Sequence, residues 1–208
     1  MKNLYFIGFI ALILFTGCRK NEDEIATSNV STINAVVLEG NDSIAVVKLL
    51  VNGIEVAKSD YCNGGFSINL PENIDSELKP FASDIPQGYK VSNRNAQFVN
   101  ATLAAYNKND KQIGKFNYLC YELVINNGEL YYVLAYESGL NYLDSDVIVT
   151  GSEREADGDY TSINVNLKKG WNFVYSSGWR PNPEGGHTNE LTTERPSGTQ
   201  WFFTNPRY

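Results

Sequence analysis

The amino-acid sequence predicts an all-β protein, built as one antiparallel β-sandwich or as two packed β subdomains. Short apolar runs with a period of two recur along the chain and are separated by tight-turn residues, which is the pattern of sandwich folds. The 208 residues include 13 Tyr and a single Met, and aromatic side chains are enriched on pleated sheets. No repeat of 20 to 50 residues indicates a solenoid.

The first third of the chain contains four expected strands, at 32–38, 46–51, 54–57 and 65–70. Asn52 and Gly53 separate the second and third, and this dipeptide is a strong hairpin signal because both residues tolerate a positive φ. In the fourth, Phe66, Ile68 and Leu70 alternate with polar residues and so share one face.

Residues 71–92 are expected to form an irregular connection. This stretch holds three prolines and Gly88, with room for one helical turn near Ile74–Leu78. We place a soft domain boundary here, between a segment at 31–80 and the strands that follow.

The second half contains seven expected strands, at 97–106, 112–118, 121–125, 130–136, 162–167, 171–175 and 201–203. The first of these has a helical alternative, because Phe98, Thr102 and Ala105 also share a helical face. Residues 90–208 either form a second antiparallel β domain or complete the sandwich that 31–80 begins.

The N-terminus has the organisation of an export signal. A positive charge at Lys2 precedes an apolar run from Leu4 to Phe15. The run is shorter than the roughly 20 apolar residues that cross a bilayer. Residues 1–17 are therefore expected to be removed.

The end of that run, Phe15-Thr16-Gly17-Cys18, resembles the lipobox of bacterial lipoproteins. The resemblance implies cleavage before Cys18 and acylation of Cys18, with palmitate among the chains, and two or more chains hold a protein stably on a bilayer. The alternative is an ordinary secreted protein with a coincidental cysteine. Residues 18–30 read as an acidic flexible tether, and Glu22-Asp23-Glu24 resembles a signal for surface export. Together these imply an outer-membrane lipoprotein displayed at the cell surface.

A second resemblance covers residues 31–70. The strand Ile33–Val37, the Asn52-Gly53 turn and the ending Asn63–Pro71 resemble transthyretin-like or carboxypeptidase-regulatory-like β-sandwich modules. Residues 167–172 and 198–202 look like the end of surface lipoproteins. These resemblances imply a structural, adhesive or binding unit and carry no catalytic residues.

Charge and cysteine usage narrow the classes of partner. Removing Lys2 with the signal leaves 16 Lys+Arg against 24 Asp+Glu, a formal charge of −8, which argues against nucleic acid. Cys62 and Cys120 remain after Cys18 is acylated. In an exported protein they can form a disulfide or stay as two thiols, and both alternatives are open.

One acidic cluster has the composition of a metal site, formed by Asp144, Asp146, Asp157 and Asp159. Oxygen ligands at alternate positions suit Ca²⁺, but the pattern lacks the other positions of an EF-hand loop. Acidic hairpin turns are the competing interpretation, and we expect no other cofactor.

Aromatic and titratable side chains offer few further candidates. Trp171 begins an apolar strand and is expected in the core, whereas Trp179 lies outside any strand pattern and is the candidate for stacking on a ligand. His187, the single histidine, falls in a Gly- and Pro-rich stretch and is expected in an exposed loop. No nucleophile-elbow or HExxH motif accompanies it, so we expect no enzymatic activity.

The leading hypothesis is therefore a non-catalytic binding or assembly module, held at a membrane by its lipid anchor, with a glycan or protein partner. A glycan-binding accessory protein would present exposed aromatics. A structural or fimbria-like subunit would present an open sheet edge. A hydrolase is the least favoured alternative.

Overall fold

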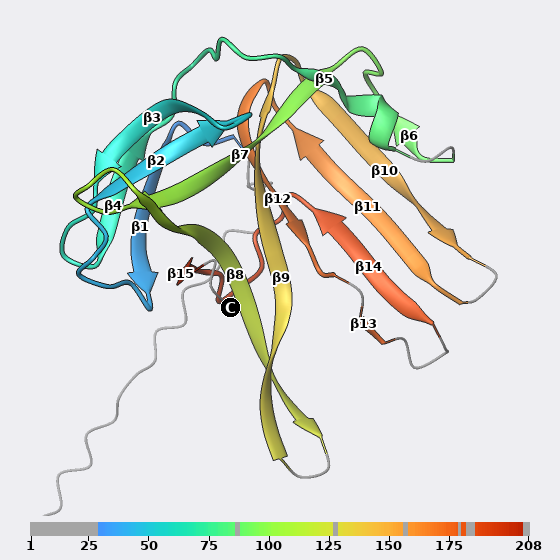
Figure 1. The fold of residues 1–208 in the computed structure, drawn as a ribbon. Helices are drawn as coiled ribbons and strands as arrows, with labels where there is room; N and C mark the ends of the chain where they lie inside the picture. Colours follow the sequence, from blue (N-terminus) through green and yellow to red (C-terminus); the bar gives the residue numbers. More distant parts are fainter. Residues whose placement is uncertain are drawn as a thin grey trace, which may run out of the picture.

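The computed structural model describes residues 29–85, 88–126, 129–155, 158–178, 180–181 and 186–205 (Figure 1). Within these residues there are fifteen strands and one short 3-10 helix, η1 at Phe81–Asp84, so the all-β prediction is confirmed. Cys18 and the signal segment lie outside the described residues. No helix in the described part of the chain is both long and apolar enough to span a membrane.

The strands are β1 Thr32–Leu38, β2 Val46–Val51, β3 Ile54–Asp60, β4 Gly65–Asn69, β5 Lys79–Pro80, β6 Lys90–Val91, β7 Gln97–Tyr106, β8 Gln112–Asn126, β9 Glu129–Leu143, β10 Val147–Arg154, β11 Tyr160–Leu167, β12 Gly170–Ser176, β13 Arg180–Pro181, β14 His187–Thr192 and β15 Gln200–Thr204.

The strands join into one continuous sheet with two halves. In the first half the order is β3-β2-β7-β8-β15-β1-β4, and in the second it is β7-β9-β12-β14-β11-β10-β6. Figure 1 shows the first half at the left and the second at the right. The segment 31–80 thus contributes strands to the same sheet as later residues, since β2 pairs with β7 and β1 with β15.

Three long strands connect the halves because each exchanges one neighbour for another along its length. β7 pairs with β9 over Phe98–Ala101 and with β8 over Leu103–Tyr106. At Leu119, β8 pairs with β15 on one side and with β9 on the other. Beyond that residue β8 and β9 continue as a two-stranded ribbon that projects from the body (Figure 1).

The sheet is mixed: most neighbouring strands are antiparallel, as predicted, and two pairs are parallel. β1 and β15 are parallel, as are β11 and β14. In both pairs the partners are separated by at least one other strand in sequence, so a long connection and not a tight hairpin brings them together.

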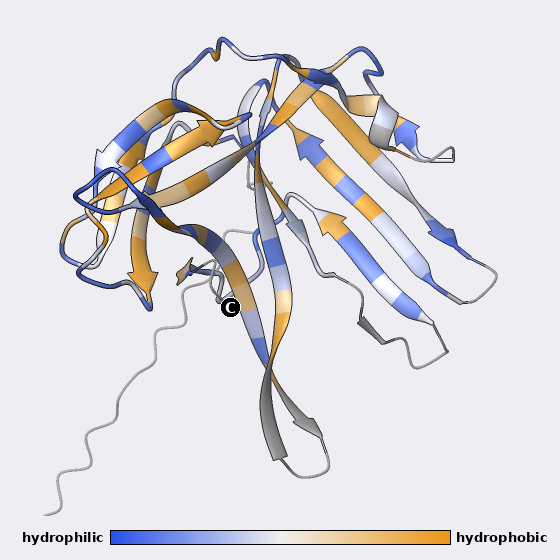
Figure 2. Ribbon diagram, in the orientation of Figure 1, coloured by the Kyte–Doolittle hydropathy of each residue, from blue (hydrophilic) through white to orange (hydrophobic). Residues whose placement is uncertain are grey.

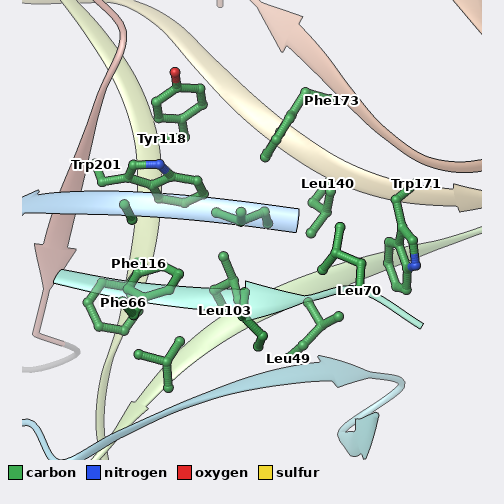
Figure 3. Close-up of a cluster of buried hydrophobic side chains, with 14 of the residues drawn as sticks. Leu49, Phe66, Leu70, Leu103, Phe116, Tyr118, Leu140, Trp171, Phe173 and Trp201 are labelled. Atoms are coloured by element: carbon green, nitrogen blue, oxygen red, sulfur yellow. The ribbon is translucent and has the colours of Figure 1, made fainter. Parts of the chain in front are cut away.

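The main hydrophobic core lies between facing parts of the two halves. Phe173 of β12 packs toward Trp201 of β15, near Phe66 of β4, and Trp171 lies at the other end of the same cluster (Figure 3). Phe173 and Trp201 meet with ring centroids 6.0 Å apart and nearly edge-on. Such face-to-face burial is the arrangement of a β-sandwich.

A smaller core covers β10 and β11. Val149 and Val165 pack there against Tyr89 and the partly buried Phe81 of η1. Figure 2 shows hydrophobic and hydrophilic residues alternating along β11, as expected for a strand with one covered face.

Several predicted elements agree with the structure and several do not. The Asn52-Gly53 turn has φ values of 50° and 79°, as predicted, and 97–106 is a strand and not a helix. The helical turn expected at 74–78 is wrong, and the only helical turn in the described residues follows at η1. The strands expected at 112–118 and 121–125 are one strand, β8.

Candidate functional site

The acidic cluster predicted as a calcium site is split between two ends of a hairpin. Asp146 precedes β10, whereas Asp159 precedes the paired strand β11 at the opposite end. An eight-residue strand such as β10 is about 25 Å long, so these two carboxylates cannot share one ion. Asp157 lies outside the described residues.

The described carboxylates of this cluster have protein partners. Asp144 Oδ1 accepts hydrogen bonds from Gln97 N at 2.9 Å and Ser145 Oγ at 2.7 Å. Asp146 accepts Lys169 N at 2.8 Å and the Lys168 ammonium at 3.1 Å, and these contacts lower the pKa of Asp146. In the described residues, no group of three or more His, Cys, Asp or Glu is placed to hold a metal ion.

His187 begins strand β14 and does not lie in a loop, which corrects the prediction. Its backbone N–H donates to Asp159 Oδ1 at 2.7 Å, and its ring Nδ1 is 3.2 Å from the same oxygen. The side chain is about half exposed. The pair joins the start of β14 to the start of β11, its parallel neighbour.

The tryptophan predictions have different outcomes. Trp171 is 2% exposed and its indole N–H donates to Pro71 O at 2.7 Å, so its assignment to the core is confirmed. Trp201 is also buried, stacked on Tyr118 at 4.6 Å between centroids. Trp179, the predicted ligand-stacking residue, lies outside the described residues.

Cys62 and Cys120 form no disulfide. Cys62 is exposed in the turn between β3 and β4, whereas Cys120 is buried on β8 and donates its thiol to Ser197 O at 3.2 Å. Of the two alternatives left open by the sequence, the structure has the two thiols, one exposed in a turn and the other buried on β8.

The feature most suited to binding is the ribbon that projects from the body, which we call the arm: Cys120–Asn126 of β8 and Glu129–Tyr136 of β9. β15 pairs with β8 only as far as Leu119, and β12 pairs with β9 only from Glu137 on. No other described strand pairs with the outer edges of the arm. A two-stranded ribbon is marginally stable in water by itself, and contacts at its base help to hold the arm: Cys120 Sγ donates to Ser197 O at 3.2 Å and Tyr136 OH to Glu190 Oε2 at 3.1 Å.

One face of the arm continues an apolar surface of the body. Tyr121 and Leu134 are directly paired and Leu123 lies two residues along, so the three share a face. Phe202 of β15 meets Tyr121 edge-on at 5.2 Å between ring centroids, and Leu38 of β1 pairs with Phe202.

This surface, the apolar strip, consists of Val36, Leu38, Phe202, Tyr121, Leu123 and Leu134. Five of its members are strongly exposed, among them Val36 at 82% and Leu123 at 53%, and Phe202 is partly exposed. Contiguous apolar surface of this kind marks interaction sites on soluble proteins.

A groove lies on the same face, where the arm leaves the body. It encloses about 430 Å³ and is lined by Glu39, Tyr121, Gly198, Gln200, Phe202 and Thr204. The rings of Tyr121 and Phe202 and the carboxylate of Glu39 thus line the same groove. This combination suits a ligand with an apolar group next to a cationic group.

The arm is also acidic. The chain has no Lys or Arg between Lys115 and Arg154, whereas Glu122, Glu129 and Glu137 fall within or beside the arm. At the base of the arm, however, Lys115 lines a hollow together with Glu137, and Arg195 lies beside Val36 and Leu38, so basic groups accompany the acidic ones there.

Comparison with protein-family models, with curated proteins and with solved structures finds no match.

Sequence reasoning identified the strands of the arm but not their exposure. No signal of this exposure was present in the sequence, because Leu130–Ala135 is uninterruptedly apolar or aromatic and such a run normally indicates a strand buried on both faces.

Proposed function

We propose that the chain is a cell-surface lipoprotein, anchored at the outer membrane through Cys18, that acts as a non-catalytic binding or assembly module. The observation that carries the proposal is the arm, an apolar ribbon with two strand edges that no described strand covers. Long apolar edges are hazards unless a partner covers them.

The position at which the chain enters the body supports this arrangement. Asn29 forms a bridge to Asn172, and Val30 N donates to Trp171 O at 2.9 Å, both on β12. Asn172 pairs with Asn141 of β9, twelve residues from Glu129 at the start of that strand. At about 3.3 Å per residue the arm reaches about 40 Å beyond this point. The chain from Cys18 therefore enters the body on β12 and not on the arm.

The nature of the exposed side chains favours a protein partner over a glycan. Among the described residues Tyr121 is the one aromatic in the strongly exposed apolar set, and its companions are aliphatic. A contiguous exposed aliphatic patch marks an interaction site and offers few rings on which a sugar could stack.

A fimbria-like structural subunit is the second candidate, favoured by the same strand edges, because strand addition is how such subunits join. A purified protein that forms ordered polymers, and loses them on Leu123→Lys, would favour this candidate over a monomeric receptor.

Anchoring is tested by metabolic labelling with palmitate, comparing the parent with Cys18→Ser. We expect label and membrane fractionation in the parent and neither in the variant, and digestion of the parent by protease added to intact cells. A variant that matures and fractionates like the parent would refute the anchor.

Binding is tested on intact cells with a photo-crosslinking residue placed at Leu123 or, as the matched control, at Ile54. Ile54 is exposed to a similar degree but lies at the β2–β3 turn, away from the arm. Reproducible adducts at Leu123 alone are expected. Equal adducts at both positions, or none, would contradict a role of the arm in binding.

A further inference from the structure

Strands β7, β8 and β9 leave a gap in the sheet where they exchange neighbours. Along β7, the ladder with β9 ends at Ala101 and the ladder with β8 begins at Leu103. Along β8, the ladder with β9 begins only at Leu119. The gap between the three ladders, which we call the window, is bordered by Thr102, Asn117, Tyr118, Ser138 and Gly139.

A hollow of about 170 Å³ occupies the window. Its lining includes the buried rings of Tyr118, Phe173 and Trp201, which belong to the main core (Figure 3). The lining also includes Lys115 and Glu137, which are exposed, so the hollow has an apolar floor and a charged mouth. A cavity of about 150 Å³ holds one benzene-sized molecule, so the window has room for one small ligand and not for a chain segment.

Gly139 keeps the mouth of the window open. It lies inside β9, and a glycine within a strand often marks a place where a ligand approaches closely. Gly139 is not among the glycines with positive φ, and a β-carbon built on it would meet only Asn141 Nδ2, at 3.5 Å. Neither its backbone conformation nor its packing against the described residues therefore requires glycine. A side chain at this position would stand on the same face as Glu137, two residues away, and cover the mouth.

Lys115 and Glu137 carry opposite charges at two ends of the mouth. Glu137 pairs with Leu119, which lies about 13 Å along β8 from Lys115. Neither side chain has an ion-pair partner among the described residues. Both are long enough to lean over the mouth, so a ligand there meets a cation on one side and an anion on the other.

Two further cations near the window are engaged elsewhere. Lys48, two strands from Lys115 in the same row of the sheet, forms ion pairs with two carboxylates at 2.7 and 3.0 Å. The Arg195 guanidinium lies over the Tyr118 ring, 5.2 Å from its centroid, and donates to a main-chain carbonyl at 3.1 Å. Lys115 and Glu137 are therefore the charged groups that a ligand in the window would meet.

We infer that the window binds a free amino acid with an apolar side chain of about the size of leucine. The carboxylate of this ligand contacts Lys115, its ammonium group contacts Glu137, and its side chain packs on the rings of the floor. Charge-assisted hydrogen bonds are about twice as strong as neutral ones, so a zwitterion gains more at this mouth than an uncharged sugar does. The site goes beyond the binding function proposed for the arm and does not depend on it.

The test is isothermal titration of the purified protein with leucine and three comparison ligands. Leucinamide lacks the carboxylate, N-acetylleucine lacks the ammonium group, and glucose is uncharged. We expect saturable binding of leucine at millimolar concentrations or below, and at least about tenfold weaker binding of each comparison ligand.

Protein variants locate the binding. Lys115→Met should remove the preference for leucine over leucinamide, and Glu137→Gln the preference over N-acetylleucine, because each variant lacks the group that distinguishes the two ligands. Lys108→Met, in the exposed loop between β7 and β8, is the matched control and should bind leucine as the parent does. Gly139→Leu should abolish binding by occupying the mouth, at a Tm close to that of the parent, because its β-carbon has space.

No saturable binding of leucine at millimolar concentrations would overturn the inference, as would equal affinity for leucine and its two derivatives or tighter binding of glucose. Undiminished leucine binding by a folded Gly139→Leu variant would also overturn it, since the ligand would then lie elsewhere. In each of these cases, crosslinks specific to Leu123 on intact cells would leave the proposed function standing and refute this inference alone.

Discussion

Replacing the buried Asn172 should destabilise the whole fold. Its side chain is fully buried on β12 and closes the turn before that strand. Oδ1 accepts Lys168 N at 2.9 Å, while Nδ2 donates to Lys168 O at 2.6 Å and Gly170 O at 2.9 Å. The same residue pairs with Asn141 and bridges to Asn29, so the turn, the second half of the sheet and the entering chain meet there.

Asn172→Ala leaves one N–H and two carbonyls without these bonds, and a buried group left unsatisfied costs about 1–3 kcal/mol. Because Lys168 and Gly170 are half-buried, water replaces part of the loss. We therefore expect a loss of about 2–4 kcal/mol in the free energy of unfolding. For a chain of this size that lowers Tm by about 5–15 °C.

Thermal unfolding followed by circular dichroism checks this value, with Asn100→Ala as the control because Asn100 is exposed on β7. The isosteric Asn172→Asp adds a pH test. The introduced carboxyl would face the carbonyls that Nδ2 now contacts, which raises its pKa in the folded state. The variant should therefore be closest to the parent below about pH 4 and lose stability as the pH rises. Parent-like stability of Asn172→Ala would refute the reasoning.

Three further predictions concern packing, thiols and pH. Gly114→Val should cost roughly 1–3 kcal/mol in urea unfolding, because its β-carbon would overlap a ring and a carbonyl of β15, whereas Gly139→Ala has space and should be tolerated. Cys62 should react with a thiol reagent in the native protein, whereas Cys120 should react only after unfolding. The mass of the protein should not change on reduction. Rapid reaction of both thiols would contradict the burial of Cys120. The lowered pKa of Asp146 stabilises the folded state above the unfolded pKa of about 4, and this stability is lost as the pH falls through the folded pKa. Asp146→Asn should therefore make the free energy of unfolding depend less on pH in the acid range. An unchanged pH dependence would count against the contact.

Sequence patterns predicted the elements whose signals are local. The Asn52-Gly53 turn follows from two residues with positive φ, and β4 follows from strict alternation, so both matched the structure. Strands β10 and β14 were missed because polar residues obscure their apolar faces. In β10 these are Gly151 and Glu153, and most of β14 is polar, so only the smaller core reveals which side is covered. Their strand state comes from pairing with neighbours distant in sequence.

The candidate site depended even more on tertiary structure. Asp146 and Asp159 are close in sequence but lie at opposite ends of a hairpin, and no local pattern reports that separation. Conversely, Phe202 and Tyr121 are distant in sequence and meet at the groove. Apolar runs indicate burial by default, so exposure of the arm could be recognised only once the strands that fail to cover it were known.

The exchange of neighbours along β8 and β9 has a mechanical consequence. A pull on the tip of the arm, opposed by the tether at Asn29, would run along β9 and cross to β12 through a ladder that extends from Gly170 to Ser176. Loaded parallel to its strands, such a ladder must break many hydrogen bonds together and cannot open one bond at a time. A ligand held at the far end could therefore strain its attachment without unravelling the sheet behind it.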